Sequence, residues 1–432
     1  MLEVGAGTGY SALPLGDLCN TGVDVLGPGP LPELGAVTLR GFPFAIGVDP
    51  VRCFVGLGRG LAEHLALPLE ATAHNVLFAW RLLESPILEG GPAGIAVAEL
   101  RFRFEDGTDE RVTIRDRFEI AVVPPGWGQN PFRAQPDVYD SLPRRYEGAF
   151  DSTGSRQTEA RQGEPRSWWI WAWRNPRPDV PLRSVEIGAL GPRFVIAGIT
   201  VGDIDEGPLQ LPGASTLRID VIDPEIAART PLDLEVAVDR GVSTFTYSLP
   251  TQSLEHALQD PLRGFGEPVN RGSSPAYVRV ASLPSGTVIV RSGGGELGSA
   301  TWPEIVAGEA QAGPARIRLI DPGRNWVRTE IVDAASGRPV PCRVHFRSPD
   351  GVPYAPHGHH SHVGGDMGTW HIDVGGDVRL GRLSYAYVDG ICEGWLPRGE
   401  VIVDIARGFE YEPLRKLVTI EPGQQRLQLE LT

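Results

Sequence analysis

The sequence predicts an all-β fold made of tandem antiparallel β-sandwiches, and three observations support this prediction. Short stretches in which apolar and polar residues alternate recur along most of the chain and are bounded by turn-forming residues. The 54 glycines and 39 prolines are dispersed over the 432 residues, as frequent turns between short strands require. Alternating strand and helix patterns, which would indicate a parallel α/β sheet, are absent from the sequence. We expect three units, at residues 1–205, 206–314 and 315–432.

The N-terminal unit contains the clearest hairpin pattern. Leu100, Phe102 and Phe104 fall on one face of a strand, and the arginines between them fall on the other. The turn pair Asp106-Gly107 separates this strand from a second alternating segment. The strands expected in this unit are Ala36–Gly47, Arg52–Leu57, Asn75–Leu83, Gly94–Glu105, Glu110–Val122, Ser167–Trp173 and Arg193–Gly202.

Three segments of this unit resemble galactose-binding-like sandwich domains, which are found attached to glycan-active and other hydrolases. The segments read LRGFPFAIG, RFRFEDGTDERVTIRDRFEI and WWIWAWRNPRPDVPLRSVEI. The resemblance implies a jelly-roll sandwich over most of residues 10–205, in which the last of these segments contains a strand that ends near the sheet edge.

The richest aromatic run in the chain, residues 168–173, reads Trp-Trp-Ile-Trp-Ala-Trp. In a strand, alternate tryptophans of this run share one face. One interpretation makes that face a stacking platform for a sugar or an aromatic ligand, with polar groups at its edge. The other makes the run a central strand with both faces buried, because large aromatic side chains mostly lie inside proteins. The candidate ligand-binding residues are Trp169, Trp171, Trp173, Trp127, Arg115 and Asn175.

The middle unit is predicted to form an immunoglobulin-like sandwich or a bridging sheet. One short helix is expected at Ser253–Leu258, and a further short turn begins at Pro303. No motif in this unit suggests chemistry. The expected strands are Thr216–Ile222, Leu232–Val238, Ser243–Leu249, Ala276–Leu283 and Thr287–Arg291.

The C-terminal unit opens with turn-forming residues between two strand-like segments. Residues 333–341 read Asp-Ala-Ala-Ser-Gly-Arg-Pro-Val-Pro. Gly337 can adopt a positive φ, while Pro339 and Pro341 cannot donate an N–H to a β-ladder. Short alternating strands at the spacing found here predict a small antiparallel sandwich. The expected strands are Arg343–Phe346, Leu383–Val388, Glu400–Ile405, Lys416–Ile420 and Arg426–Leu431.

The segments DAASGRPVPCRV, LPRGEVIVDIARGFEYEPLRKLVTIEPGQ and LQLEL resemble the carboxypeptidase-regulatory-like, or transthyretin-like, module. More narrowly, residues 396–399 and 407–413 are similar to the segment just upstream of the catalytic domain in CehA/McbA-type metallohydrolases. In that family a metal-binding barrel of the polymerase-and-histidinol-phosphatase type follows. The resemblance implies an accessory region whose partner is a downstream catalytic domain, and we expect that barrel to be missing from this chain.

A histidine-rich stretch in the same unit is the one constellation that suggests metal chemistry. In an extended segment, His357 and His359 would share one side and His360 and His362 the other. Neutral imidazoles suit a divalent transition metal such as zinc, and Asp366 could add a carboxylate ligand. Too few residues follow this stretch for it to be the first H-x-H motif of a metallohydrolase barrel. The alternative is a glycine-flanked polar loop that packs on a neighbouring unit or subunit.

The net charge limits the partners of this protein, and the spacing of its cysteines limits its metal and redox chemistry. The formal net charge of −14 argues against nucleic acid or an anionic membrane as a partner, because the field of the protein would repel both. The four cysteines form no C-x-x-C pair, so buried free thiols are expected in place of a zinc knuckle or a redox motif. No signal-peptide pattern and no apolar window of about 18 residues is present, and we expect a cytoplasmic protein.

Three functions remain open. The leading hypothesis is a non-catalytic region that positions or oligomerises the metal-dependent barrel of a CehA/McbA-type hydrolase, with self-association through sandwich faces. The second is a stand-alone ligand- or carbohydrate-binding module. The third is a metal-binding protein or metalloenzyme that uses the histidine stretch. No catalytic residue is assigned, because the sequence holds no G-x-S-x-G, H-E-x-x-H or P-loop pattern.

Overall fold

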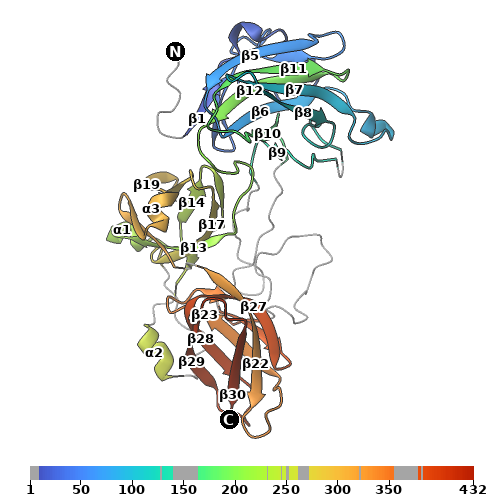
Figure 1. Cartoon of the computed structure of the whole chain (residues 1–432). Helices are drawn as coiled ribbons and strands as arrows, with labels where there is room; N and C mark the ends of the chain where they lie inside the picture. The colour runs from blue at the N-terminus through green and yellow to red at the C-terminus, as the bar shows by residue number, and fades with distance from the viewer. Residues whose placement is uncertain are drawn as a thin grey trace.

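The computed structural model describes residues 9–126, 129–139, 164–230, 232–244, 246–249, 253–260, 272–320, 323–354, 378–380 and 383–432. In these residues the chain forms three groups of β-sheets that follow one another along the long axis of the molecule (Figure 1). The all-β prediction is confirmed, since the helices are few and short. No helix in the described part of the chain is long and apolar enough to cross a membrane.

The N-terminal group is built in three layers. One sheet has the strand order β1-β12-β6-β10-β9, with β4 also paired to β12, and a second sheet has the order β5-β11-β7-β8. The hairpin of β2 and β3 packs on the far side of the first sheet, which is therefore covered on both faces. The strands are β1 Tyr10–Leu13, β2 Gly35–Leu39, β3 Phe42–Ile46, β4 Val55–Leu57, β5 His64–Ala71, β6 Asn75–Leu82, β7 Ala96–Phe104, β8 Asp109–Arg115, β9 Gln135–Pro136, β10 Trp169–Arg174, β11 Leu182–Ala189 and β12 Phe194–Gly202, and the 3₁₀ turns are η1 Gly16–Leu18, η2 Val23–Leu26 and η3 Pro86–Glu89.

The hairpin predicted from the sequence is the pair β7–β8. Leu100, Phe102 and Phe104 are buried between the two sheets, as their alternation requires. Arg101, on the opposite face, donates two hydrogen bonds to Asp109 at 2.7 and 2.9 Å. The turn forms because its glycine adopts a φ of 85°, which a side chain would resist.

Two strands of the second sheet, β5 and β11, were missed by the sequence analysis. Strand β5 alternates buried leucines with exposed residues, but it contains Pro68. Proline lacks the N–H that a central strand needs, and here it is tolerated because β5 is the edge strand of its sheet.

The middle group consists of a sheet with the order β15-β17-β13-β21-β20, with β16 beside β17, and a second sheet with the order β14-β18-β19. The apolar faces of both sheets share one core. The elements are β13 Ser215–Val221, α1 Pro224–Ala227, β14 Leu234–Val238, β15 Gly241–Ser243, β16 Tyr247–Ser248, β17 Ala276–Ser282, β18 Thr287–Ser292, β19 Gly295–Thr301, α3 Trp302–Val306, β20 Glu309–Ala312 and β21 Ala315–Leu319.

The expected boundary between residues 314 and 315 is wrong. Strand β21 pairs with β13 of the middle sheet, and Ile317 is buried in the middle core opposite Ile219. The third group therefore begins after β21, with β22 (Arg324–Asp333).

The predicted short helix is α2 (Leu254–Gln259), and the Ser253 hydroxyl caps it by accepting a hydrogen bond from the His256 N–H. The helix follows the middle strands in sequence, yet it lies against β29 of the C-terminal sandwich (Figure 1).

The C-terminal group is a sandwich of a sheet with the order β27-β22-β30 and a sheet with the order β25-β26-β23-β28-β29, with β24 beside β23. The first strand β22 and the last strand β30 are parallel neighbours, so the antiparallel prediction is wrong for this pair. The predicted turn at residues 333–337 forms, since Gly337 has a φ of 67° and its N–H donates to the carbonyl of Asp333. The strands after β22 are β23 Cys342–Arg347, β24 Pro353–Tyr354, β25 Val378–Leu380, β26 Leu383–Val388, β27 Ile391–Pro397, β28 Gly399–Ala406, β29 Leu414–Ile420 and β30 Arg426–Leu431.

Candidate functional site

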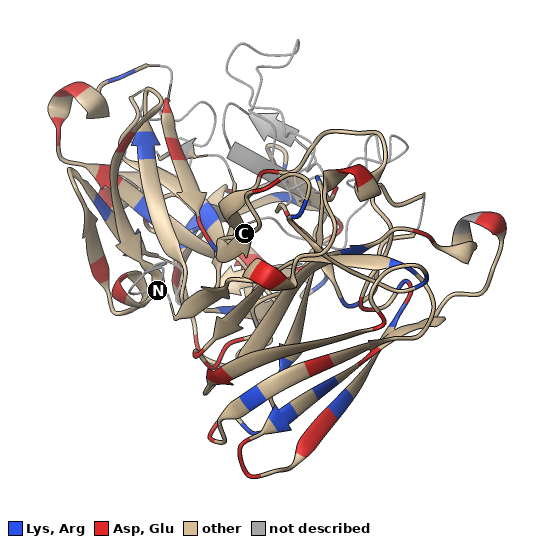
Figure 2. Cartoon of the chain, turned by 90° about the horizontal axis from the view of Figure 1, so that it is seen from above, with Lys and Arg blue, Asp and Glu red and all other residues tan. Residues whose placement is uncertain are grey.

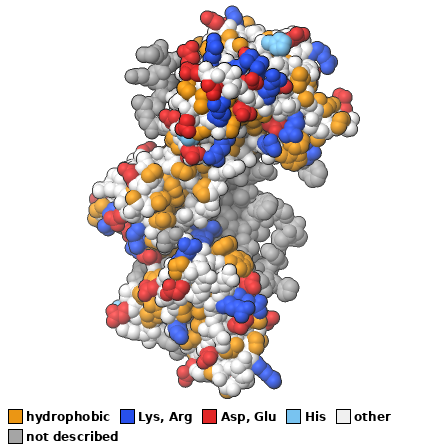
Figure 3. Space-filling view, in the orientation of Figure 1, with side chains coloured by type: hydrophobic (Ala, Val, Ile, Leu, Met, Phe, Trp, Pro, Cys, Tyr) orange, Lys and Arg blue, Asp and Glu red, His pale blue; other side chains and the backbone are white. Residues whose placement is uncertain are grey.

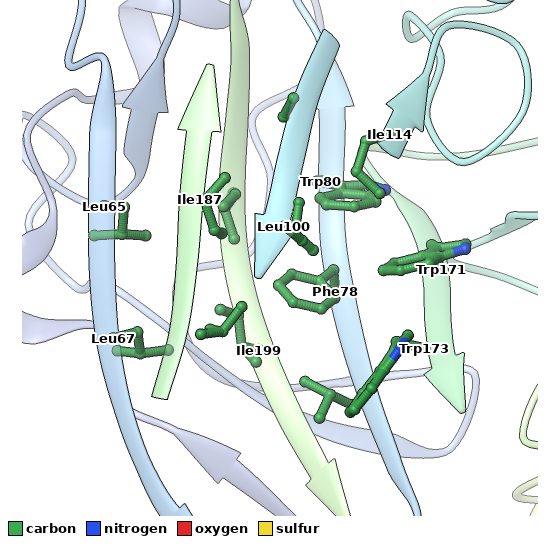
Figure 4. Close-up of a cluster of buried hydrophobic side chains, with 14 of the residues drawn as sticks. Leu65, Leu67, Phe78, Trp80, Leu100, Ile114, Trp171, Trp173, Ile187 and Ile199 are labelled. Atoms are coloured by element: carbon green, nitrogen blue, oxygen red, sulfur yellow. The ribbon is translucent and has the colours of Figure 1, made fainter. Parts of the chain in front are cut away.

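The tryptophan run of β10 lies inside the N-terminal sandwich. Trp169, Trp171 and Trp173 are 1%, 5% and 6% exposed and belong to the core between the two sheets. Figure 4 shows Trp171 and Trp173 within this core. The indole of Trp171 stacks on Trp80 with ring centroids 5.3 Å apart. On the other face of β10, Trp168 packs in the core beneath the β2–β3 hairpin. The structure thus follows the buried-strand interpretation, and the prediction of a stacking platform on these three rings is wrong because neither face of the run is open to a ligand.

The polar residues predicted to border that platform have structural partners. Asn175 is 4% exposed, donates to the carbonyl of Ala73 at 2.7 Å and accepts from the Arg177 N–H at 2.9 Å. Arg115 donates to both carboxylate oxygens of the buried Glu119. Trp127, the third residue of this set, lies outside the described residues. The two described residues therefore hold loops of the sandwich in place.

The histidine stretch falls outside the part of the chain that the structure describes. This applies to His357, His359, His360, His362 and Asp366. Within the described ranges, no group of three or more His, Cys, Asp or Glu side chains is placed to hold a metal ion.

A buried polar cluster joins the N-terminal and middle groups. The Glu206 carboxylate accepts hydrogen bonds from the Tyr10 hydroxyl at 2.8 Å and from the Ser285 hydroxyl at 2.6 Å. Arg240, which is 1% exposed, donates to the same Ser285 hydroxyl at 2.8 Å and to the carbonyl of Gly41 at 3.1 Å. Burial and the nearby Glu206 carboxylate raise the pKa of Tyr10 above its usual range, so the phenol remains a donor.

Backbone packing at this joint is also close. A Cβ on Gly41 would lie 2.2 Å from the carbonyl oxygen of Asp239, so no larger residue fits there. Leu283 of the middle group packs into the core beneath the β2–β3 hairpin. Charge, hydrogen bonding and packing therefore fix these two groups against each other.

Ion pairs join the middle and C-terminal groups. Asp350, in the turn after β23, accepts from Arg218 at 2.7 Å and from Arg318 at 3.0 Å. Leu249 and Tyr277 of the middle group pack against the apolar core of the C-terminal sandwich. This joint is partly exposed to solvent, so its ion pairs are weaker than buried ones.

A second buried charge cluster lies between α2 and the outer face of β28 and β29. The Arg415 guanidinium pairs with Asp404 and also donates to the carbonyls of Ala257 and Asp260 at 2.8 and 2.9 Å. These two carbonyls belong to the C-terminal end of α2, where a cation is favourable. Arg415 thus attaches the helix to the C-terminal sandwich.

We expect the substitution Arg415→Ala to release α2. Amides of residues 254–259 should exchange with deuterium at least about tenfold faster, because two charge-assisted hydrogen bonds to the helix end are lost. Hydrogen–deuterium exchange with mass spectrometry measures this. Arg426→Ala, which removes an exposed arginine from the same sandwich, serves as the control and should change nothing in α2. Unchanged exchange in the Arg415 variant would show that other contacts hold the helix.

Two exposed tryptophans were missed by the sequence analysis. Trp326 on β22 and Trp395 on β27 are direct cross-strand neighbours, and they are 40% and 47% exposed. The signal was present in the strand alternation, because Trp326 falls on the same face of the strand as Arg328 and Glu330, whereas Val327 and Thr329 fall on the buried face.

Surface charges of both signs are interleaved. Basic and acidic residues alternate along neighbouring strands (Figure 2), and they intermingle over the visible face of the N-terminal sandwich (Figure 3). Many of them form cross-strand pairs, such as Arg103 with Glu186.

Comparison with known proteins leaves the family open. No family model matches the chain, and no curated protein matches it. Among solved structures, the Bacillus anthracis TIE protein aligns over 87% of this chain and 53% of its own, with 10% identity and a TM-score of 0.15. BcpA, the major pilin subunit of Bacillus cereus, aligns over 82% of this chain and 99% of its own, with 8% identity and a TM-score of 0.17. The chain spans about half the length of the TIE protein, and similarity at this level supports no functional argument.

Proposed function

We propose that this chain is a non-catalytic support made of three joined β-sandwiches, which positions or oligomerises the metal-dependent barrel of a CehA/McbA-type hydrolase. The observation that supports the proposal most directly is the use of buried charge. Arg240 and Glu206 lie where the first two groups meet, and Arg415 lies where α2 meets the third. Buried polar networks of this kind give an arrangement its specificity, which a support requires.

The resemblance of residues 396–399 and 407–413 to the segment upstream of the catalytic domain supplies the hydrolase part of the proposal. In the structure the first of these segments spans the end of β27 and the start of β28, and the second is the turn between β28 and β29. The first segment therefore connects the two sheets of the sandwich, and the second belongs to the sheet on which α2 rests, so a following domain would be attached to a braced sandwich.

The proposal predicts that the purified chain does not hydrolyse phenyl esters or carbamates when Zn²⁺, Mn²⁺, Ni²⁺ or Fe²⁺ is added. The reason is that the charged side chains in its described interior hold structural contacts. Release of p-nitrophenol from an ester and of 1-naphthol from a carbamate measures the reaction, with each metal alone in buffer as the blank. Turnover that scales with protein concentration and disappears with a chelator would overturn the proposal. A His357→Ala/His359→Ala variant then tells whether the histidine stretch is responsible.

A further inference from the structure

We propose that the outer face of the sheet β27-β22-β30 is a binding site for a neutral oligosaccharide. Trp326 and Trp395 form its centre, and their rings meet edge to face with centroids 5.4 Å apart and an interplanar angle of 75°. The two indoles therefore form a corner, in which one ring can lie beneath a ligand while the other stands beside it.

The orientation of one ring is held by a hydrogen bond. The indole N–H of Trp326 donates to Oε2 of Glu393 at 3.0 Å. This contact restrains the ring, and the side chain remains 40% exposed. A restrained aromatic ring loses little entropy when a ligand stacks on it, which favours binding.

Polar side chains lie next to the indoles on the same face of the sheet. Arg328 and Glu393 are cross-strand neighbours whose charged groups lie 3.5 Å apart, and both side chains are partly exposed. Glu330 pairs with Arg328 at 3.2 Å, and Gln428 lies beside Glu330 on β30. These groups supply planar donors and carboxylate acceptors next to the aromatic corner.

This combination matches the chemistry of a sugar ring. The C–H groups on one face of a pyranose pack against the electron-rich face of an aromatic ring. Its hydroxyl groups donate and accept in pairs, as arginine and carboxylate side chains do. Because Arg328 and Arg426 are balanced on this face by Glu330 and Glu393, we expect no preference for an anionic ligand.

The size of the apolar patch argues against a second protein. The indoles are 40% and 47% exposed, and their exposed parts together amount to roughly 200 Å². A stable protein interface buries about 1,200 Å² or more in total, which is about 600 Å² on each partner. An area of this size instead suits one or two sugar rings. The inference is independent of the proposed support function, since a support can also bind a glycan.

Titration calorimetry with the whole chain tests the site, using cellohexaose, xylohexaose, laminarihexaose, mannohexaose and maltohexaose as probes at millimolar concentration. We expect the wild-type chain to bind at least one of these five. Trp395→Ala should weaken that binding about tenfold or more, as loss of an aromatic stacking contact implies. Trp395→Tyr should retain most of the affinity, because it keeps an aromatic ring.

Phe409→Ala is the matched control, because Phe409 is a fully exposed aromatic residue in the same sandwich but outside this sheet. It should bind like the wild type. The proposal is overturned if none of the five hexasaccharides binds to the wild-type chain, or if Trp395→Ala binds as tightly as the wild type. Sedimentation velocity adds a third outcome. A dimer that Trp395→Ala dissociates would assign the face to a second copy of this chain and also overturn the proposal.

Discussion

Replacing Trp171 by alanine should lower the free energy of unfolding of the N-terminal sandwich by about 3–5 kcal/mol. The indole is 5% exposed and packs against Trp80 and Phe78, so its removal leaves a large cavity between the two sheets (Figure 4). Neighbouring rings cannot fill that cavity, because β6 and β10 are fixed by their ladder of backbone hydrogen bonds. For a unit of this size the loss corresponds to a decrease in melting temperature of about 10 °C.

Scanning calorimetry and urea titration followed by circular dichroism measure this effect. Trp395→Ala is the matched control, since the same atoms are removed from a side chain that is 47% exposed, and we expect less than about 1 kcal/mol of change. The loss of unfolding free energy in Trp171→Phe should lie between those of the two alanine variants, because a smaller aromatic ring fills part of the space. If Trp171→Ala unfolds like the wild-type chain, the ring is not part of the core and the ligand-platform interpretation regains its basis.

The second large effect is expected at the joint between the first two groups. Arg240→Ala should destabilise the attachment of the N-terminal sandwich to the middle group by about 3–5 kcal/mol. The substitution removes a buried cation that shares the Ser285 hydroxyl with the buried Glu206 carboxylate, and it leaves the carbonyl of Gly41 without this donor. Because the lost contacts join two groups, we expect domain separation before either core unfolds.

Distance measurements between spin labels detect that separation. Glu105 in the N-terminal sandwich and Glu309 in the middle group are both exposed, so the double variant Glu105→Cys/Glu309→Cys takes one label on each side of the joint. We expect a single narrow distance distribution with arginine at position 240 and a broad one with alanine. A narrow distribution in both proteins would mean that Arg240 is dispensable for the joint.

The native cysteines do not interfere with this labelling. All four are buried and free, as the sequence analysis predicted. Burial raises the pKa of Cys53 to about 11 and of both Cys342 and Cys392 to about 12, so these thiols stay protonated and unreactive near neutral pH. For stability, Arg316→Ala provides the control, because this exposed arginine of the middle group forms a long surface ion pair with Glu309, which contributes little.

Several local features could be predicted correctly from the sequence. The alternation of Leu100, Phe102 and Phe104 identified the buried face of β7, and Ser253 marked the start of α2. Gly337 marked the turn after β22. Each of these features depends on a few consecutive residues whose backbone preferences and side-chain directions follow from short-range sterics.

Whether a tryptophan is buried or exposed was harder to predict. Trp171 and Trp395 are the same residue type in alternating segments, yet one is in a core and the other on a surface. The difference arises because β10 is covered by the β2–β3 hairpin on one side and by the second sheet on the other, whereas β27 is an edge strand on which Trp395 is 47% exposed. Whether a strand is covered on both faces or lies at the edge of a sheet cannot be deduced from its own residues.

By itself, the sequence determined that this protein is all-β, where most of its strands run and how its sharp turns are made, because alternation and turn chemistry act over a few residues. Only the tertiary structure decided that β21 belongs to the middle sheet, that α2 is attached to the C-terminal sandwich through Arg415, and that Trp326 and Trp395 form an exposed pair. These outcomes depend on pairing between segments far apart in the chain, and the stability of such pairs comes from mutual burial that neither segment displays alone.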